Sequence, residues 1–108
     1  MGKASRTKGA RGQSAFANLL RDRDYTVAPV SCGVLAEDLI ATDCAGVTWS
    51  VEVKNTKTIT HSAIVQARMQ ATKRKARWML AQHIAGSSSW LIRRQGMRPA
   101  VWHERGEE

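Results

Sequence analysis

The sequence has few cysteines and lacks any long apolar run. Its two cysteines, Cys32 and Cys44, are not in a CxxC spacing, and no paired cysteine and histidine pattern of a zinc site is present. We therefore expect two reduced thiols, the alternative being zinc held by Cys32, Cys44 and His61. The absence of a run of about 18 apolar residues excludes a transmembrane helix. The basic N-terminus also lacks the apolar core of a signal peptide. We expect a cytoplasmic protein with no membrane partner.

Acidic residues are scarce as well. The chain has 9 Asp and Glu against 17 Lys and Arg, a formal net charge of +8, and the stretch from Lys54 to His103 contains no acid. Basic side chains in that stretch have no acidic neighbours in sequence to neutralise them, which predicts contacts with the phosphates of a nucleic acid. A solvated helical face is the alternative. The residues that we expect to bind nucleic acid are Lys8, Arg11, Lys57, Arg68, Lys73, Arg74 and Lys75.

The length and the charge pattern predict one domain with charged ends. A chain of 108 residues suits a single domain. Residues 1–11 carry basic side chains among Gly, Ala, Ser and Thr and are predicted to form a flexible basic arm. Residues 12–103 then form the folded domain, and the acidic residues 104–108 a frayed tail.

Periodicity predicts a helix followed by three strands in the first half of the domain. The spacing of Phe16, Leu19 and Leu20 predicts one buried stripe on a helix over residues 13–22. Strands are predicted over 25–30, 35–42 and 47–54. The last has Val47, Trp49, Val51 and Val53 alternating with polar residues. Pro29 makes the first strand a poor central strand.

The second half is predicted to contain a helix and two strands. A helix is expected over residues 60–75, capped by Thr60 or Ser62. Residues 77–84 are consistent with a longer helix or a strand. We prefer the strand because a Gly/Ser turn and the strand-like run 90–94 follow. Residues 100–102 are a possible short edge segment. The order αβββαββ predicts an α/β domain with a central mixed sheet flanked by helices, in which Trp49 and Trp78 pack in the core.

The residues that best indicate chemistry are Asp38, Glu52 and Lys54. Glu52 and Lys54 are two apart on one predicted strand and so share a face, and the preceding strand can bring Asp38 beside them. Glu37 competes with Asp38 for this role but would point to the opposite face. Two carboxylates attract a hard divalent cation, and an adjacent lysine can position or deprotonate a water. In so basic a chain these residues predict hydrolysis of a phosphodiester, the alternative being an ordinary solvated ion pair.

These motifs resemble the PD-(D/E)XK nuclease superfamily, and within it the archaeal and phage-type Holliday-junction resolvases. The resemblance is carried by the segments Lys8-Gly9-Ala10-Arg11-Gly12-Gln13, Glu37-Asp38-Leu39-Ile40 and Glu52-Val53-Lys54. It implies a restriction-endonuclease-like core and an endodeoxyribonuclease that acts as a homodimer on branched or four-way junction DNA. It also implies a bacterial or phage-infected host cell.

The resemblance assigns roles to five residues. Mg²⁺, which Mn²⁺ can replace, is expected on Asp38, Glu52 and the Val53 carbonyl, with Lys54 as a catalytic residue. Gln13 stands where the family has an acid on its first helix, and Glu37 where it has a proline. A glutamine can still hold a metal-bound water, or it can mark an inactivated nuclease. The alternatives are therefore a non-catalytic DNA-binding module, a nuclease acting on other DNA, and a small basic RNA-binding protein.

Overall fold

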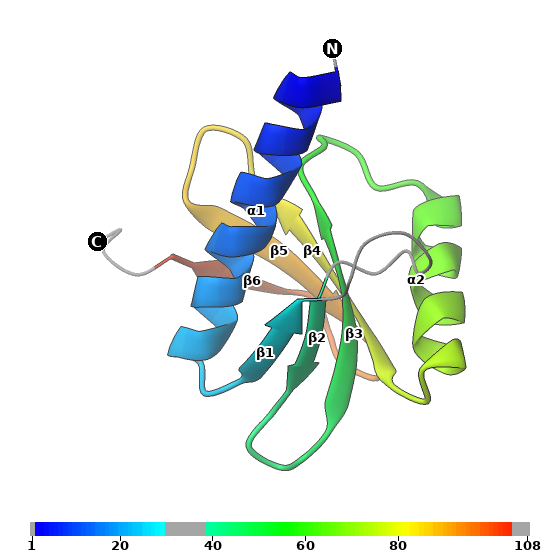
Figure 1. Ribbon diagram of the computed structural model, residues 1–108. Helices are drawn as coiled ribbons and strands as arrows, with labels where there is room; N and C mark the ends of the chain where they lie inside the picture. The colour runs from blue at the N-terminus through cyan, green and yellow to red at the C-terminus, as the bar shows by residue number, and fades with distance from the viewer. Residues whose placement is uncertain (1, 30–38, 105–108) are drawn as a thin grey trace.

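The computed structural model describes residues 2–29 and 39–104, which form a six-stranded sheet and two helices (Figure 1). The sheet lies in sequence order, β1-β2-β3-β4-β5-β6. Neighbouring strands are antiparallel except β3 and β4, which are parallel. The elements are α1 (Gly2–Asp22), β1 (Thr26–Pro29), β2 (Leu39–Thr42), β3 (Thr48–Lys54), α2 (His61–Lys73), β4 (Arg77–His83), β5 (Ser89–Arg94) and β6 (Ala100–His103). The predicted mixed sheet with flanking helices is confirmed.

The order differs from the prediction by one strand. The helix–strand choice over 77–84 is settled in favour of a strand, β4, but two more strands follow it where the predicted order has one. The possible edge segment is the sixth strand, β6. It forms because Trp102 pairs with Trp90 in the ladder and is only 6% exposed. β1, with Pro29, lies at the opposite edge of the sheet, where a missing backbone donor is tolerated.

Helix α1 begins at Gly2 rather than at residue 13. It thus includes residues 2–11, which the sequence analysis assigned to a flexible basic arm. The physical reason is that Ala, Lys and Arg, which are common in this segment, are good helix formers. The division into a basic arm, a nuclease-like domain and an acidic tail stays a prediction.

The main core lies between α1 and one face of the sheet. Phe16 packs against Trp90 and Trp102, with ring centroids 5.1 and 6.2 Å apart. Val51 on β3 is also fully buried in this cluster. The prediction of a core position is confirmed for Trp49 but wrong for Trp78, which is half-buried. Trp78 follows Arg77 at the start of β4, on the face that α2 covers, and lines a surface hollow there with Arg68 and Thr72.

Helix α2 packs against β3 and β4 and lies on the other side of the sheet from α1 (Figure 1). Its N-cap is Thr60, whose hydroxyl accepts a hydrogen bond from the backbone N–H of Ala63 at 3.2 Å. At its C-terminal end the N–H of Ala76 donates to the Ala71 carbonyl, and Lys75 adopts a positive φ of 56°. Within the described residues, neither helix is long and apolar enough to cross a membrane.

Asp43 holds the hairpin between β2 and β3 and so supports their register. Its Oδ1 accepts hydrogen bonds from the backbone N–H groups of Ala45 and Val47, both at 2.9 Å. Its Oδ2 accepts from Trp49 Nε1 at 3.1 Å. The Val47 N–H, followed by the Trp49 indole, lowers the pKa of Asp43 below its usual 3.8. The hairpin thereby aligns Leu39 with Val51, one residue before Glu52.

Candidate active site

Strand β3 carries Glu52 and Lys54 on the face of the sheet that points away from α1. The alternate residues show this, because Val51 is buried in the α1 cluster and Val53 packs against it. Glu52 is only 7% exposed, and Lys54 is half-buried. A carboxylate is rarely buried unless it is paired or binds a cation. The end of β3 therefore combines a buried acid with a neighbouring amine.

The neighbouring strand β2 enters the same region. Leu39, its first residue, is paired with Val51 of β3. Asp38, the second acid of the predicted site, is bonded to Leu39 in the chain but lies outside the described residues, as does its competitor Glu37.

Gln13 approaches from the α1 side of the sheet. A methyl group built on its neighbour Gly12 would lie 3.9 Å from Val53 Cγ1, so α1 passes close to the end of β3. Gln13 itself is half-buried and lines a hollow of about 390 Å³ together with Val27 and Leu39. The Gln13 side chain therefore lies on the face of the sheet opposite Glu52 and Lys54. To bind the same metal as Glu52, it would have to extend around the ends of the strands.

The described residues contribute only part of any metal site. Among them, no group of three or more His, Cys, Asp and Glu side chains could hold a metal ion. Glu52 supplies one carboxylate, and the backbone carbonyl of Val53 is a further oxygen next to it. For the zinc alternative, Cys44 and His61 are exposed and Cys32 lies outside the described residues.

The predicted nucleic-acid-binding residues do not all lie near the candidate site. Lys57 lies in the loop after Lys54, whereas Lys73, Arg74 and Lys75 lie at the far end of α2. A helix of 13 residues is about 20 Å long, so these groups are separated by roughly two helix diameters. Lys8 and Arg11 lie within α1, and Gly12, next to Arg11, approaches Val53 at the end of β3.

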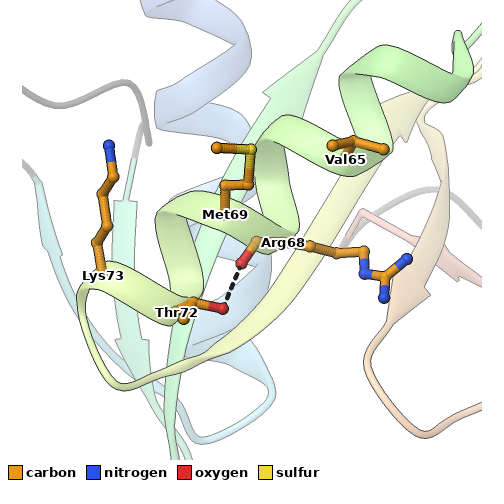
Figure 2. A pocket seen from close by; sticks show the side chains of 5 residues that line it. All are labelled: Val65, Arg68, Met69, Thr72 and Lys73. Carbon is orange, nitrogen blue, oxygen red and sulfur yellow. Dashed lines mark hydrogen bonds between the residues drawn. The ribbon is translucent and has the colours of Figure 1, made fainter.

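The basic residues of α2 also point in different directions. Arg68 and Lys73 extend to opposite sides of the helix, with Met69 between them (Figure 2). Together with Val65 and Thr72 they line a hollow of about 540 Å³, and Met69 is 54% exposed. The Thr72 hydroxyl donates to the Arg68 carbonyl at 2.9 Å. The surface of α2 is thus a mixed apolar and basic groove rather than one continuous basic stripe.

Two polar residues that sequence periodicity does not single out lie on the same face of the sheet as Lys54. Gln82 on β4 is the register partner of Lys54, and its Nε2 donates to the carbonyls of Thr56 and Lys57 at 2.9 and 2.8 Å. Arg93 on β5 donates from Nη1 to Gln82 Oε1 at 3.2 Å. Sequence periodicity places each residue on a strand, but the signal that joins them is the register of three strands, which periodicity does not contain.

Comparison with known proteins supports the fold that these elements describe. No protein-family model matches the chain, and no curated protein does. The fold is similar to that of the 1.6 Å resolution structure of Archaeoglobus fulgidus Hjc, a Holliday junction resolvase from an archaeal hyperthermophile. The TM-score is 0.64 at 17% sequence identity, over 90% of this chain and 84% of that chain. The chain therefore shares its restriction-endonuclease-like α/β fold with an archaeal resolvase.

Proposed function

We propose that this protein is a metal-dependent endodeoxyribonuclease of structured DNA, a Holliday-junction resolvase of phage or prophage type. The observation that carries the proposal is the nearly buried carboxylate of Glu52, which shares the end of β3 with Lys54. The neighbouring strand β2 begins directly after Asp38 in the sequence. The likeness in fold to an archaeal resolvase supports it. So does the acid-free stretch from Lys54 to His103, which suits a polyanion.

The donor set fits a hard divalent cation. Asp38, Glu52 and the carbonyl of Val53 would supply oxygen ligands, the type that Mg²⁺ prefers and that Mn²⁺ also accepts. Glu52 is only 7% exposed, which reduces the screening of its attraction to a cation by solvent. When bound, such an ion acts as a Lewis acid and lowers the pKa of a coordinated water.

The other residues of the site would orient water and stabilise charge. Lys54, on the same face as Glu52, would orient the attacking water and offset the charge that develops on the phosphate. Gln13, whose amide oxygen is an acceptor, would hold a water at the α1 side of the strands. The half-buried setting of Lys54 strengthens its interaction with an anion, because screening by solvent is reduced there.

The proposed partner is four-way junction DNA, bound by a homodimer in an intracellular setting. A junction has two-fold symmetry, so paired cuts require two copies of the active site related by a C2 axis. The late strands and the turn between them offer exposed apolar residues for a dimer interface, with Met97 in the turn 49% exposed and Val101 in β6 50% exposed. Phosphate contacts are assigned to Lys8, Arg11, Lys57, Arg68, Lys73, Arg74 and Lys75.

Incubation with labelled DNA tests this function. The full chain is mixed with a four-way junction or with a linear duplex of matched sequence, each with and without Mg²⁺. We expect cleavage of the junction in the presence of Mg²⁺, by paired cuts at symmetric positions. Equal cleavage of the duplex would favour a nuclease of the same fold that acts on other DNA.

One observation favours a second candidate, a DNA-binding module without catalysis. Gln13 stands where the resolvases that the sequence resembles have an acid, and it lies toward the face opposite Glu52, so it brings no negative charge to a metal. Junction binding without cleavage under any divalent metal would support this candidate.

A further inference from the structure

Three strands place a row of polar side chains next to the proposed catalytic lysine. Gln82 is the register partner of Lys54, and Arg93 is the partner of Leu80, two residues before Gln82. All three polar residues are half-buried. They point away from α1, because Ala81 and Ile92, which alternate with them, belong to the α1 cluster. Lys54, Gln82 and Arg93 thus lie on one face of β3, β4 and β5.

The amide of Gln82 connects two separate parts of this face. Its Nε2 donates both hydrogens to the carbonyls of Thr56 and Lys57, at 2.9 and 2.8 Å. The backbone carbonyl oxygens can only accept hydrogen bonds, so the NH₂ group of the Gln82 amide must face them. Its Oε1 therefore points toward Arg93. Gln82 therefore ties the loop that follows Lys54 to a guanidinium on β5.

The charge of Arg93 is not neutralised within the described part of the chain. Its one hydrogen bond there is the 3.2 Å contact to a neutral amide oxygen, and no described carboxylate forms an ion pair with it. A guanidinium has five N–H donors in a planar fork, so four remain for another group. This fork matches the geometry of a phosphate, which it can bind through two parallel hydrogen bonds. A half-buried position makes such a contact stronger than one on the open surface.

The geometry points to Arg93 as a second phosphate-binding residue of the DNA site, held in place by Gln82 as a positioning residue. This inference rests on the proposed function, because it takes Lys54 as the contact to the scissile phosphate. Two strand spacings and an offset of two residues along the strands separate Lys54 from Arg93, about 12 Å in all. That span corresponds to about three or four nucleotides along one DNA strand. Arg93 therefore binds a phosphate of the cleaved strand about three or four nucleotides from the cut.

The test compares Arg93→Met with wild type in DNA binding and cleavage. Affinity for the junction is measured over a range of salt concentrations without divalent metal, and cleavage is measured with Mg²⁺. Loss of one phosphate contact should make the slope of log K against log salt shallower by about 0.9, and the KM for cleavage should rise. Arg98→Met is the matched control, because Arg98 is exposed beyond β5, at the other end of the strands from Lys54. It should change both quantities less.

Two substitutions of Gln82 separate positioning from packing. In Gln82→Glu the side chain can no longer donate to the Thr56 and Lys57 carbonyls, and its carboxylate pairs with Arg93. The slope of log K against log salt should therefore become shallower, as in Arg93→Met. Gln82→Met leaves the charge of Arg93 in place, so the slope should stay as in wild type while KM rises. A role in stability alone would lower the melting temperature of each variant without this pattern.

The outcomes separate the inference from the proposed function. A folded Arg93→Met protein with the slope and KM of wild type would overturn the inference, whether or not the wild type cuts DNA. A wild type that binds the junction but never cuts it would overturn the nuclease, while the slopes still decide the phosphate contact. If Arg93→Met does not fold, Arg93→Lys replaces it. It keeps the charge and loses the fork, so unchanged junction affinity and KM in that variant would overturn the proposed contact.

Discussion

At the residue scale, Glu52 is the most unusual side chain of the described structure. It is a carboxylate only 7% exposed, and Lys54 follows it on the same face. We expect Glu52→Gln to lower junction cleavage at least about 100-fold, the lower end of what one positioned catalytic group contributes. Junction affinity should stay the same or increase, because a negative charge near phosphate is removed. Single-turnover cleavage and binding assays measure the two effects.

A control for this variant is available in the same chain. Glu104 follows β6, three strands away from β3 in the sheet, and its backbone N–H donates to the Ser88 carbonyl. Glu104→Gln removes the same charge and should leave cleavage unchanged. If Glu52→Gln also cuts at the wild-type rate, the site is misassigned.

Gln13 gives a second prediction at this scale. Gln13→Glu would add a carboxylate at the α1 side of the strands. If the residue reaches the metal, cleavage should increase and the Mg²⁺ or Mn²⁺ concentration for half-maximal rate should fall. Titration of both proteins with each metal measures this. Identical metal dependence in the two proteins would place Gln13 outside the site, and an active variant of an inactive wild type would favour the non-catalytic module.

Asp43 predicts how stability depends on pH. Its pKa in the folded state lies below the usual 3.8, chiefly because the Val47 N–H donates to the ionised carboxylate. Its stabilising effect is therefore complete above the unfolded-state pKa and is lost as the pH falls through the lower folded-state pKa. We expect Asp43→Asn to be less stable than wild type at neutral pH, and the two proteins to converge below about pH 4.

Urea unfolding from neutral to acid pH measures this convergence. The asparagine can still accept from the Ala45 and Val47 N–H groups, but its NH₂ group would face the Trp49 indole N–H. A constant stability difference across the whole pH range would show that the carboxylate charge is not the cause.

At the element scale, the end of α2 contains a residue in an unfavourable backbone conformation. Lys75 has a φ of 56°, and the N–H of Ala76 donates to the Ala71 carbonyl at 2.8 Å. Glycine is preferred in this conformation because it has no Cβ. We expect Lys75→Gly to raise the free energy of unfolding by about 0.5–1 kcal/mol. Denaturant unfolding measures it, with Gln66→Gly, at an exposed position inside the regular helix, as a control that should be destabilising.

The elements that follow a clear sequence period could be predicted, and those that depend on distant partners could not. Alternation in residues 47–54 correctly predicts β3, and Thr60 correctly predicts the start of α2. Trp102 is buried because Phe16, far away in sequence, stacks on it, so no local pattern reveals that β6 belongs to the sheet. Trp78 stays half-buried because it lies at the start of β4, where Arg68 and Thr72 of α2 line a hollow with it, and no strand pattern reveals the position of that helix.

The candidate site also has features that could be predicted from the sequence and features that could not. The shared face of Glu52 and Lys54 follows from a period of two within one strand. The contact of Gln82 with the loop carbonyls requires the register of β3 against β4, which are joined through a whole helix. Likewise, the basic residues in the sequence around α2 suggest one patch, but the length of the helix separates Lys57 from Lys75.

At the scale of the whole molecule, charge is the dominant property. The net charge is +8, and basic residues lie near both ends of α2, with Lys57 before its start and Lys73, Arg74 and Lys75 at its end. We expect the affinity for junction or duplex DNA to fall with salt at a slope steeper than about −3, because each phosphate contact contributes about −0.9. Fluorescence anisotropy at several salt concentrations measures the slope. A flat response would remove nucleic acid as the partner.

The aromatic contacts of α1 have a consequence for how the protein is made. Every strand of the sheet pairs with its neighbour in sequence, so pairing can begin while the chain is still being synthesised. The rings that cover Phe16, however, belong to Trp90 and Trp102. A nascent chain that has reached only β4 therefore leaves an aromatic face of its first helix exposed to solvent or to a chaperone. Completion of the last strand at the ribosome is the step that encloses the first helix.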